Sequence, residues 1–280
     1  MDGPAIGTLY VVGTPIGNLA DLSTRAASVL RAAEVIAAES PRNARPLLAH
    51  LGLTARPVAY NDRNKTRSAG RLLAALRAGR SVALISDADT PGLSDPGQDL
   101  VAAAVAAGAP VVPVPGPSAA TALLSVAGVR TRTVRLLGFL PRRRGERRAL
   151  LASLGESGEP GLAFESPRRV GAALTDVAAV LPEALLVVGR ELTKLHEEIW
   201  RGSPAEAVAH FASSDGEAPR GEFTLLIVPP AGATSRWSEA RVRSALQAER
   251  SAGRGRREAS VEVAAQSGWG RSEVYRLWAG

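Results

Sequence analysis

The stretch Leu9-Tyr10-Val11-Val12-Gly13-Thr14-Pro15-Ile16-Gly17-Asn18 decides the fold class of this chain. Four apolar residues form a short strand, and a loop rich in glycine and proline follows it. Apolar runs return at Val35–Ala38, Ser81–Ile85 and Val111–Val114, and helical stretches such as Arg67–Ala78 separate them. Strands that are apolar on both faces and alternate with helices predict a mainly parallel sheet covered by helices.

After Ser118 the pattern changes, because several candidate strands follow one another without a helix between them. The candidate strands are Val134–Gly138, Leu162–Glu165, Leu185–Arg190, Glu197–Arg201 and Glu222–Val228. The candidate helices are Arg147–Leu154, Arg168–Val180 and Pro204–Phe211. This order predicts a second domain of the α+β class.

The last part of the chain is typical of a small helical unit. Pro229-Pro230-Ala231-Gly232 has the composition of a linker. Helices are expected at Glu239–Ala252, Ser260–Gln266 and Ser272–Trp278, and the last two resemble a helix-turn-helix. We therefore predict an α/β fold in three parts: an N-terminal α/β domain (1–116), a C-terminal α+β domain (117–230) and a basic helical tail (231–280).

Composition excludes several classes of protein. With 280 residues, 45% of them hydrophobic and 22% charged, the chain can bury a large core. It has no cysteine, and its three histidines are far apart, so neither a thiol nucleophile nor a zinc site is expected. No apolar run reaches the ~20 residues of a membrane span, and no signal peptide is expected, which favours the cytoplasm.

The net charge of +7 is concentrated in two segments. Residues 142–148 hold five arginines against one glutamate, and residues 236–280 hold nine arginines against five glutamates. A bias toward arginine explains why Lys65 and Lys194 are the only lysines, but it does not explain the clustering. Such basic patches favour a polyanionic partner such as nucleic acid.

Four loops follow strands and carry the functional signal: residues 13–18, 86–92, 113–119 and 164–168. In open α/β sheets, ligands bind at the carboxyl ends of the strands. The loops contain no P-loop, no G-x-G-x-x-G pattern and no G-x-S-x-G elbow. The absence of these signatures excludes a P-loop NTPase and argues against NAD enzymes, the common Rossmann methyltransferases and α/β-hydrolases.

Seven motifs, in order, resemble the tetrapyrrole methylase superfamily, and most closely its branch that methylates small-subunit ribosomal RNA. They are Leu9–Leu19, the Ser86 loop, Pro115–Ala119, Gly138–Pro141, Glu165–Arg169, Arg190–Lys194 and Gly221–Phe223. The resemblance implies 2′-O-methylation of a cytidine in the decoding region of 16S rRNA, with S-adenosylmethionine as donor. It also implies two α/β domains with the cofactor in the cleft between them, and a homodimer.

The resemblance assigns eight residues to the cofactor: Pro15, Asp87, Thr90, Ser118, Ala119, Phe164, Leu192 and Gly221. Six residues are assigned to RNA: Arg42, Asn64, Arg142, Arg143, Arg144 and Arg168. A ribose hydroxyl is a weak acid, so a base or a cation beside it should help its attack. Glu165, Lys194 and Asp62 are the candidates for this role, although each could instead form a structural ion pair or loop cap.

The chain departs from the family pattern at three places. Glu39-Ser40-Pro41-Arg42 stands where the family usually has Glu-Asp-Thr-Arg, and Asn61-Asp62-Arg63-Asn64 stands where it has a His-Asp-His-Asn-like stretch. Asp89 replaces a glycine of the Ser-Asp-Ala-Gly-Thr-Pro motif, and aspartate is among the few side chains that tolerate positive φ. Two alternatives stay open. One is methylation of a tetrapyrrole or other small molecule, because a fold alone does not fix function. The other is a noncatalytic RNA- or ribosome-binding protein, which Asp89 and the lost carboxylate allow.

Overall fold

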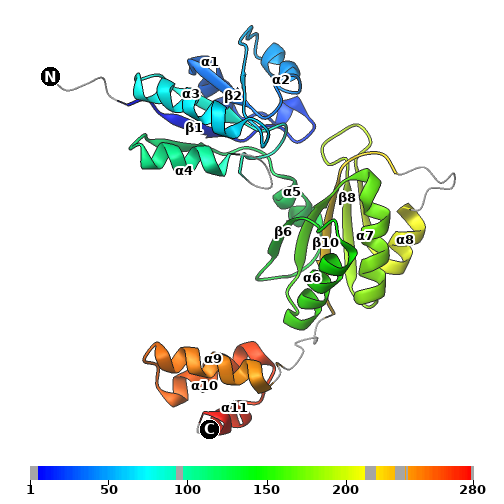
Figure 1. The fold of residues 1–280 in the computed structure, drawn as a ribbon. Coiled ribbons are helices and arrows are strands. Elements are labelled where there is room, and N and C mark those ends of the chain that lie inside the picture. The colour runs from blue at the N-terminus through cyan, green and yellow to red at the C-terminus, as the bar shows by residue number, and fades with distance from the viewer. Residues whose placement is uncertain (1–5, 93–96, 212–218, 231–236, 238, 279–280) are drawn as a thin grey trace. The chain divides into compact units, whose positions relative to one another are not determined.

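The computed structural model describes residues 6–92, 97–211, 219–230, 237 and 239–278 (Figure 1). Contacts along the chain divide it into two compact units. Unit 1 comprises Met1–Gly128 together with Gly189–Glu198, and unit 2 comprises Val129–Val188 together with Ile199–Gly280. Residues 117–128 and 189–198 therefore group with unit 1, although the two ends of the second segment are the last residues of β8 (Leu185–Arg190) and the first residue of β9 (Glu198–Gly202).

Unit 1 is built on a five-stranded sheet in the order β3-β2-β4-β1-β5, and every described strand pair in it is parallel. Its strands are β1 (Leu9–Val12), β2 (Val35–Ala38), β3 (Val58–Ala59), β4 (Val82–Ile85) and β5 (Val111–Val114). Its helices are α1 (Thr24–Ala32), α2 (Arg45–His50), α3 (Lys65–Arg77), α4 (Gln98–Ala106) and α5 (Ala119–Val126), with a 3-10 turn at Leu19–Asp21. The predicted parallel α/β sheet is confirmed, whereas β3, α2 and α5 are elements that the sequence pattern did not indicate.

Helices cover both faces of this sheet, which explains why its strands are apolar throughout. Ala83 and Ile85 of β4 pack in one cluster with residues of α1 and α2. Val82 and Leu84, which alternate with them, pack in another cluster with residues of α3 and α4. Because successive side chains of a strand point to opposite faces, one short strand contributes to both cores.

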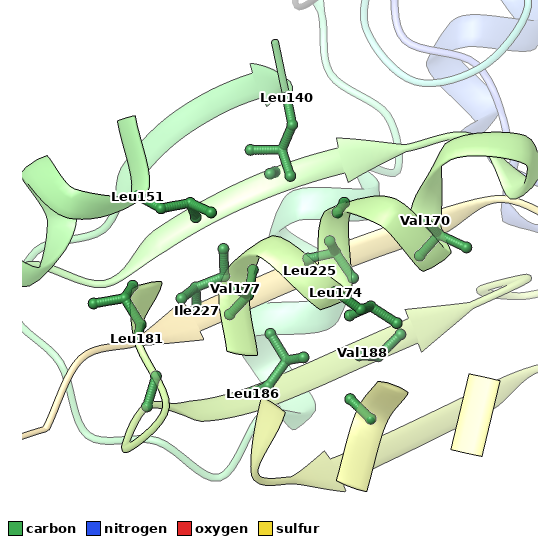
Figure 2. Packing of buried hydrophobic residues seen from close by; sticks show 14 of the residues in the cluster. Leu140, Leu151, Val170, Leu174, Val177, Leu181, Leu186, Val188, Leu225 and Ile227 are labelled. Atoms are coloured by element: carbon green, nitrogen blue, oxygen red, sulfur yellow. The ribbon is translucent and has the colours of Figure 1, made fainter. Parts of the chain in front are cut away.

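Unit 2 has a five-stranded sheet in the order β6-β7-β10-β8-β9. Its strands are β6 (Arg135–Phe139), β7 (Gly161–Glu165), β8 (Leu185–Arg190), β9 (Glu198–Gly202) and β10 (Phe223–Val228), and its helices are α6 (Arg144–Ser157), α7 (Pro167–Val180) and α8 (Pro204–Phe211). Strand β7 is parallel to β6 and antiparallel to β10, so the second sheet is mixed, which agrees with the α+β class predicted for this part of the chain. Figure 2 shows Val170, Leu174 and Val177 of α7 packed over this sheet.

The C-terminal region contains α9 (Glu239–Ser251), α10 (Arg256–Ser267) and α11 (Arg271–Leu277). Helix α10 ends at Gly268 in the left-handed conformation, and α11 begins after Gly270, so the predicted helix–turn–helix is present. Trp237, Trp269 and Trp278 pack against its small core. The predicted linker at 229–232 runs into residues 231–236, which lie outside the described residues.

The boundary with the largest consequence is the start of α6. The sequence pattern places this helix at Arg147, but it begins at Arg144. Three arginines therefore lie on a helix at spacing i, i+3 and i+4 and share one face. In the part of the chain that the structure describes, no helix has the length and apolar character needed to cross a membrane.

Candidate functional site

Two loops of unit 1 meet at the carboxyl edge of the parallel sheet. Strands β1 and β5 are hydrogen-bonded neighbours, and the loops that follow them start at Gly13 and Gly116. A Cβ atom added to Gly13 would lie 2.7 Å from the Gly116 amide nitrogen, and one added to Gly116 would lie 2.6 Å from the Gly13 carbonyl oxygen. Only glycine permits two backbones to approach this closely.

Asp89 joins a third loop, which follows β4, to this pair. Its backbone has φ +63°, the left-handed conformation expected for the glycine that it replaces. Its carbonyl oxygen accepts a hydrogen bond from the Thr14 amide (2.9 Å). Its carboxylate accepts hydrogen bonds from the Thr90 amide (2.7 Å), the Ser118 hydroxyl (3.0 Å) and the Ala119 amide (2.9 Å).

The Asp89 carboxylate therefore caps helix α5 from outside the helix. Ser118 occupies the N-cap position of α5, but its side chain accepts no capping hydrogen bond. A carboxylate at a helix N-terminus satisfies an otherwise unpaired amide and opposes the positive end of the helix dipole. Three residues that the resemblance assigns to the cofactor, Thr90, Ser118 and Ala119, are held together by this one side chain.

Asp87 braces the neighbouring loop instead of its own turn. Its carboxylate accepts hydrogen bonds from the Ser40 amide (3.1 Å) and the Asn43 side-chain amide (2.6 Å). Its own amide donates to the Glu39 carboxylate (3.3 Å). The loops that follow β2 and β4 are thereby tied together, and two carboxylates are brought close to each other.

Glu39 is a candidate that sequence reasoning did not single out. Burial raises its pKa, and the nearby carboxylates of Asp87 and Asp62 raise it further, while the hydrogen bond from the Asp87 amide opposes this rise. A carboxyl group with a raised pKa at the ligand-binding edge of an α/β sheet has the properties of a general base. The available signal was its position, the first residue after β2, in the Glu39–Arg42 motif.

The segment 189–198 supplies unit 1 with a further loop. A Cβ atom on Gly17 would clash with Cγ of Lys194 and lie 3.1 Å from the Leu192 carbonyl oxygen, so these residues pack directly on the loop after β1. Glu191 and Thr193 have φ of +51° and +66°, values that are rare for residues other than glycine. Leu192 and Lys194 are therefore brought to the same loop group as Pro15.

The three predicted catalytic residues lie in different surroundings. Lys194 Nζ forms an ion pair with Glu191 (2.8 Å). The Asp62 side chain is 81% exposed and lies 3.5 Å from Lys65 Nζ. In unit 2, the Glu165 side chain is fully buried, and its oxygens contact the Ser166 amide (2.8 Å) and an Arg169 guanidinium nitrogen (2.9 Å).

Glu165 has the environment of a structural carboxylate. Burial raises its pKa, against the opposing effects of the Ser166 hydrogen bond and the positive charges of Arg169 and Arg147. Ser166 is the N-cap residue of α7, so Glu165 fixes the first turn of that helix. The other assigned residues of unit 2 lie at the same end of its sheet: Phe164 in β7 pairs with Thr224, and Gly221, with φ +101°, precedes β10.

The residues assigned to RNA divide into exposed and engaged side chains. Arg42, Arg142 and Arg168 are exposed, and their guanidinium groups have no partner among the described residues. Asn64 accepts a hydrogen bond from the Asn61 amide (2.9 Å) and so braces a turn. Arg143 pairs with Glu146 (3.1 Å).

Arg144 takes part in a buried charge cluster with Arg147 and Arg148. All three guanidinium groups contact the carboxylate of Asp176 in α7, at 3.2, 2.5 and 2.7 Å respectively. The side chain of Asp176 is only 2% exposed. The basic run that follows β6 is therefore anchored to α7 by one carboxylate.

Residues 8–208 match the family model described as Tetrapyrrole (Corrin/Porphyrin) Methylases. The chain belongs to the tetrapyrrole methylase family. It is 41% identical over 97% of its length to a Synechocystis protein named ribosomal RNA small subunit methyltransferase I, and covers 97% of that protein. A Neisseria meningitidis serogroup B protein of the same name is 43% identical over 80% of the chain and 76% of the relative.

Two solved structures share the fold. Uroporphyrin-III-C-methyltransferase from Thermus thermophilus superposes with a TM-score of 0.55 at 21% identity, over 79% of this chain and 94% of that one. Diphthine synthase gives a TM-score of 0.57 at 13% identity, over 80% and 90% of the two chains. The donor used by methyltransferases of this family is S-adenosylmethionine.

The loop group of unit 1 fits this donor in chemical character. S-adenosylmethionine carries a positive sulfonium and a positive ammonium group against one carboxylate. Glu39, Asp87 and Asp89 place three carboxyl groups in the loops after β2 and β4. A cationic ligand is stabilised by such a negative edge, and glycine-rich backbone allows it to approach main-chain polar groups.

The Asp176 cluster predicts a specific loss of stability in acid. Burial alone would raise the pKa of Asp176, but hydrogen bonds from Arg148, Arg147 and Arg144 outweigh it and the pKa is lowered. The ionised carboxylate therefore contributes stability above its unfolded pKa, and this contribution is lost as the pH falls below about 4. We expect Asp176→Asn to be less stable than wild type at pH 7 and the difference to shrink toward pH 2, measured by urea unfolding. A difference independent of pH would contradict this.

Proposed function

We propose that this chain is a cytoplasmic S-adenosylmethionine-dependent methyltransferase that modifies the ribose 2′-hydroxyl of a cytidine in the decoding region of 16S rRNA. The observation that carries the proposal is the 41% identity, over nearly the whole of both chains, to a relative named ribosomal RNA small subunit methyltransferase I. The arginine-rich start of α6 and the basic C-terminal helices support an RNA substrate. The small ribosomal subunit is the proposed partner, and a homodimer is the proposed assembly.

We assign the donor to the loop group of unit 1. Pro15, Thr90, Ser118, Ala119 and Leu192 would line it. The donor supplies an electrophilic methyl group, which an in-line attack transfers. Alignment is then the main task of the protein, and the contacts between Asp89 and the loops after β1 and β5 keep those loops in one arrangement. Phe164 and Gly221 remain assigned to the donor by the resemblance.

We assign the general-base role to Glu39 ahead of Glu165, Lys194 and Asp62. A base must reach the ribose hydroxyl, and the Glu165 side chain is fully buried. Glu39 is only partly buried and has a pKa raised toward the working range. Lys194 is suited to stabilising the negative charge that develops on the ribose oxygen, because it is a cation on the loop beside Gly17.

Replacing Glu39 by glutamine is expected to lower kcat by roughly 10²- to 10⁴-fold, the usual contribution of a general base. In the wild type, kcat/KM should rise with pH through the raised pKa of Glu39, and Glu39→Gln should lose this rise. Asp62→Asn removes a carboxylate that raises this pKa, so the rise should move to lower pH. The measurement is steady-state methyl transfer from pH 4 to 9, which gives both kcat and kcat/KM. An unchanged pH profile in Glu39→Gln would assign the base elsewhere.

The proposed reaction is tested with small ribosomal subunits from a strain that lacks the gene of this protein. The subunits are incubated with the protein and labelled donor, and the rRNA fragments are analysed by mass spectrometry. Label on a cytidine ribose in the decoding region supports the proposal. Label on a tetrapyrrole but not on rRNA would support small-molecule methylation, and RNA binding without any label would support a noncatalytic role.

A further inference from the structure

The Asp176 cluster carries an inference beyond the methyl-transfer reaction, and it rests on the proposed RNA substrate. Asp176 lies in α7 and is 2% exposed, whereas the three arginines that contact it differ in exposure. The Arg147 side chain is 8% exposed, Arg148 is 37% exposed and Arg144 is 68% exposed. One end of the cluster is therefore in the core of unit 2 and the other is at its surface.

The hydrogen bonds distinguish Arg147, which is fully engaged inside the protein, from Arg144 and Arg148, which are only partly engaged. Arg147 uses Nε and Nη2 on Asp176, and its Nη1 donates to the carbonyl oxygens of Pro141 (3.1 Å) and Arg142 (3.3 Å). Arg144 and Arg148 contact Asp176 through Nε alone. Their terminal nitrogens make no hydrogen bond to other described residues. Each of these two guanidinium groups is thus fixed through Nε, while its tip, the two terminal Nη atoms, can still donate hydrogen bonds to a ligand.

The charges of this cluster do not balance. One carboxylate faces three guanidinium groups, which leaves an excess of two positive charges. Arg143 and Glu146 neutralise each other, and Arg142 adds a further unpaired charge among the described residues. Holding like charges together costs free energy, and a bound anion would lower that cost. Guanidinium tips match the oxygens of a phosphate group in bidentate geometry.

We propose that Asp176 is a positioning residue for RNA, and that it fixes Arg144 and Arg148 so that their free tips bind phosphates of the rRNA backbone. The same carboxylate fixes the Pro141–Arg142 turn through Arg147. Pre-arranged side chains lose less conformational entropy on binding, so they bind RNA more tightly than mobile arginines of equal charge.

Two substitutions separate positioning from charge. Asp176→Asn and Glu146→Gln each remove one negative charge from the same region, but Glu146 is 56% exposed and, among the described residues, forms an ion pair with Arg143 alone. If charge alone governs RNA binding, both variants bind RNA more tightly than wild type. Positioning predicts that Glu146→Gln binds as well as wild type or better, and that Asp176→Asn binds about tenfold more weakly despite its extra positive charge.

The affinity for a small-subunit rRNA fragment is measured between 50 and 300 mM salt, with donor affinity as the control for folding. The double variant Arg144→Lys/Arg148→Lys keeps both charges. A lysine, however, has a single ammonium nitrogen, so it cannot contact Asp176 through one nitrogen and a phosphate through two others, as an arginine can. We expect it to bind RNA more weakly than wild type, with a shallower salt dependence and unchanged donor affinity.

Tighter RNA binding by Asp176→Asn, or wild-type RNA binding by the double lysine variant, would overturn the inference. If Asp176→Asn does not fold, the RNA affinity of the double lysine variant alone tests the inference. Wild-type protein that binds rRNA with this pattern but methylates no rRNA would refute the proposed reaction and leave the positioning role intact. If the wild-type protein methylates rRNA and both variants bind RNA with wild-type affinity, only the positioning role is refuted.

Discussion

Gly116→Ala is expected to weaken donor binding strongly in a protein that still forms its second sheet. The added Cβ atom would lie 2.6 Å from the carbonyl oxygen and 2.7 Å from the carbonyl carbon of Gly13. Both are backbone atoms at the end of β1, so no side chain can rotate to make room. The loops after β1 and β5 must separate, which we expect to cost about 1–3 kcal/mol of stability and at least 10²-fold in donor affinity.

The matched control is Gly70→Ala, in the interior of α3. A Cβ atom at Gly70 meets nothing within 4 Å, so this variant adds the same methyl group without a clash. We expect it to gain about 0.5–1 kcal/mol in unfolding free energy and to bind donor as wild type does. Isothermal calorimetry with donor and urea unfolding measure both quantities. Wild-type donor affinity in Gly116→Ala would show that the two loops do not form the donor site.

Asp89 gives the second large effect, in a series of three side chains. Asp89→Val loses the contacts to Ser118 and Ala119 and places a β-branched residue at φ +63°, so we expect it to lose about 2–4 kcal/mol of stability and most of its donor binding. Asp89→Gly loses the same contacts but relieves the backbone strain, so its stability should remain within about 1 kcal/mol of wild type. Asp89→Asn tolerates the backbone conformation and keeps one acceptor oxygen, so its stability should fall between those of wild type and Asp89→Val.

The comparison of glycine with valine separates backbone from side-chain effects at Asp89. Thermal unfolding gives the stability order, and calorimetry gives the donor affinity of each variant. Equal losses of stability and donor affinity in Asp89→Gly and Asp89→Val would show that only the carboxylate contacts matter and that the backbone conformation costs nothing. Wild-type stability and donor affinity in both variants would show that the loop after β4 depends neither on these contacts nor on this backbone conformation.

The fold could be predicted because its main determinants are local. All four residues of β4 are buried, β1 begins and ends on a buried residue, and Ser23, which caps α1 through the Ala26 amide (3.1 Å), marks a helix start in the sequence. The start of α6 was misplaced by three residues, because a run of arginines carries no apolar periodicity. Its helical conformation is favoured by a tertiary partner, Asp176, which is about thirty residues away in the chain.

The candidate site could be predicted only in part from the sequence. Motif resemblance assigned Thr90, Ser118 and Ala119 to one site, and the hydrogen bonds of Asp89 bring them together. The pairing of Asp87 with the loop at Ser40 depends on the order of strands in the sheet, which local sequence does not encode. The raised pKa of Glu39 arises from the same strand order, because its neighbours Asp62 and Asp87 follow different strands.

The connection between β8 and β9 has a consequence for biosynthesis. Residues 189–198 complete the first unit, yet they leave the ribosome some sixty residues after that unit's last preceding residue, Gly128. A nascent chain that has emerged only as far as Gly128 lacks the backbone that covers Gly17, so its first lobe must wait for the second to be translated. Dissecting the protein at a single peptide bond would for the same reason leave one fragment incomplete.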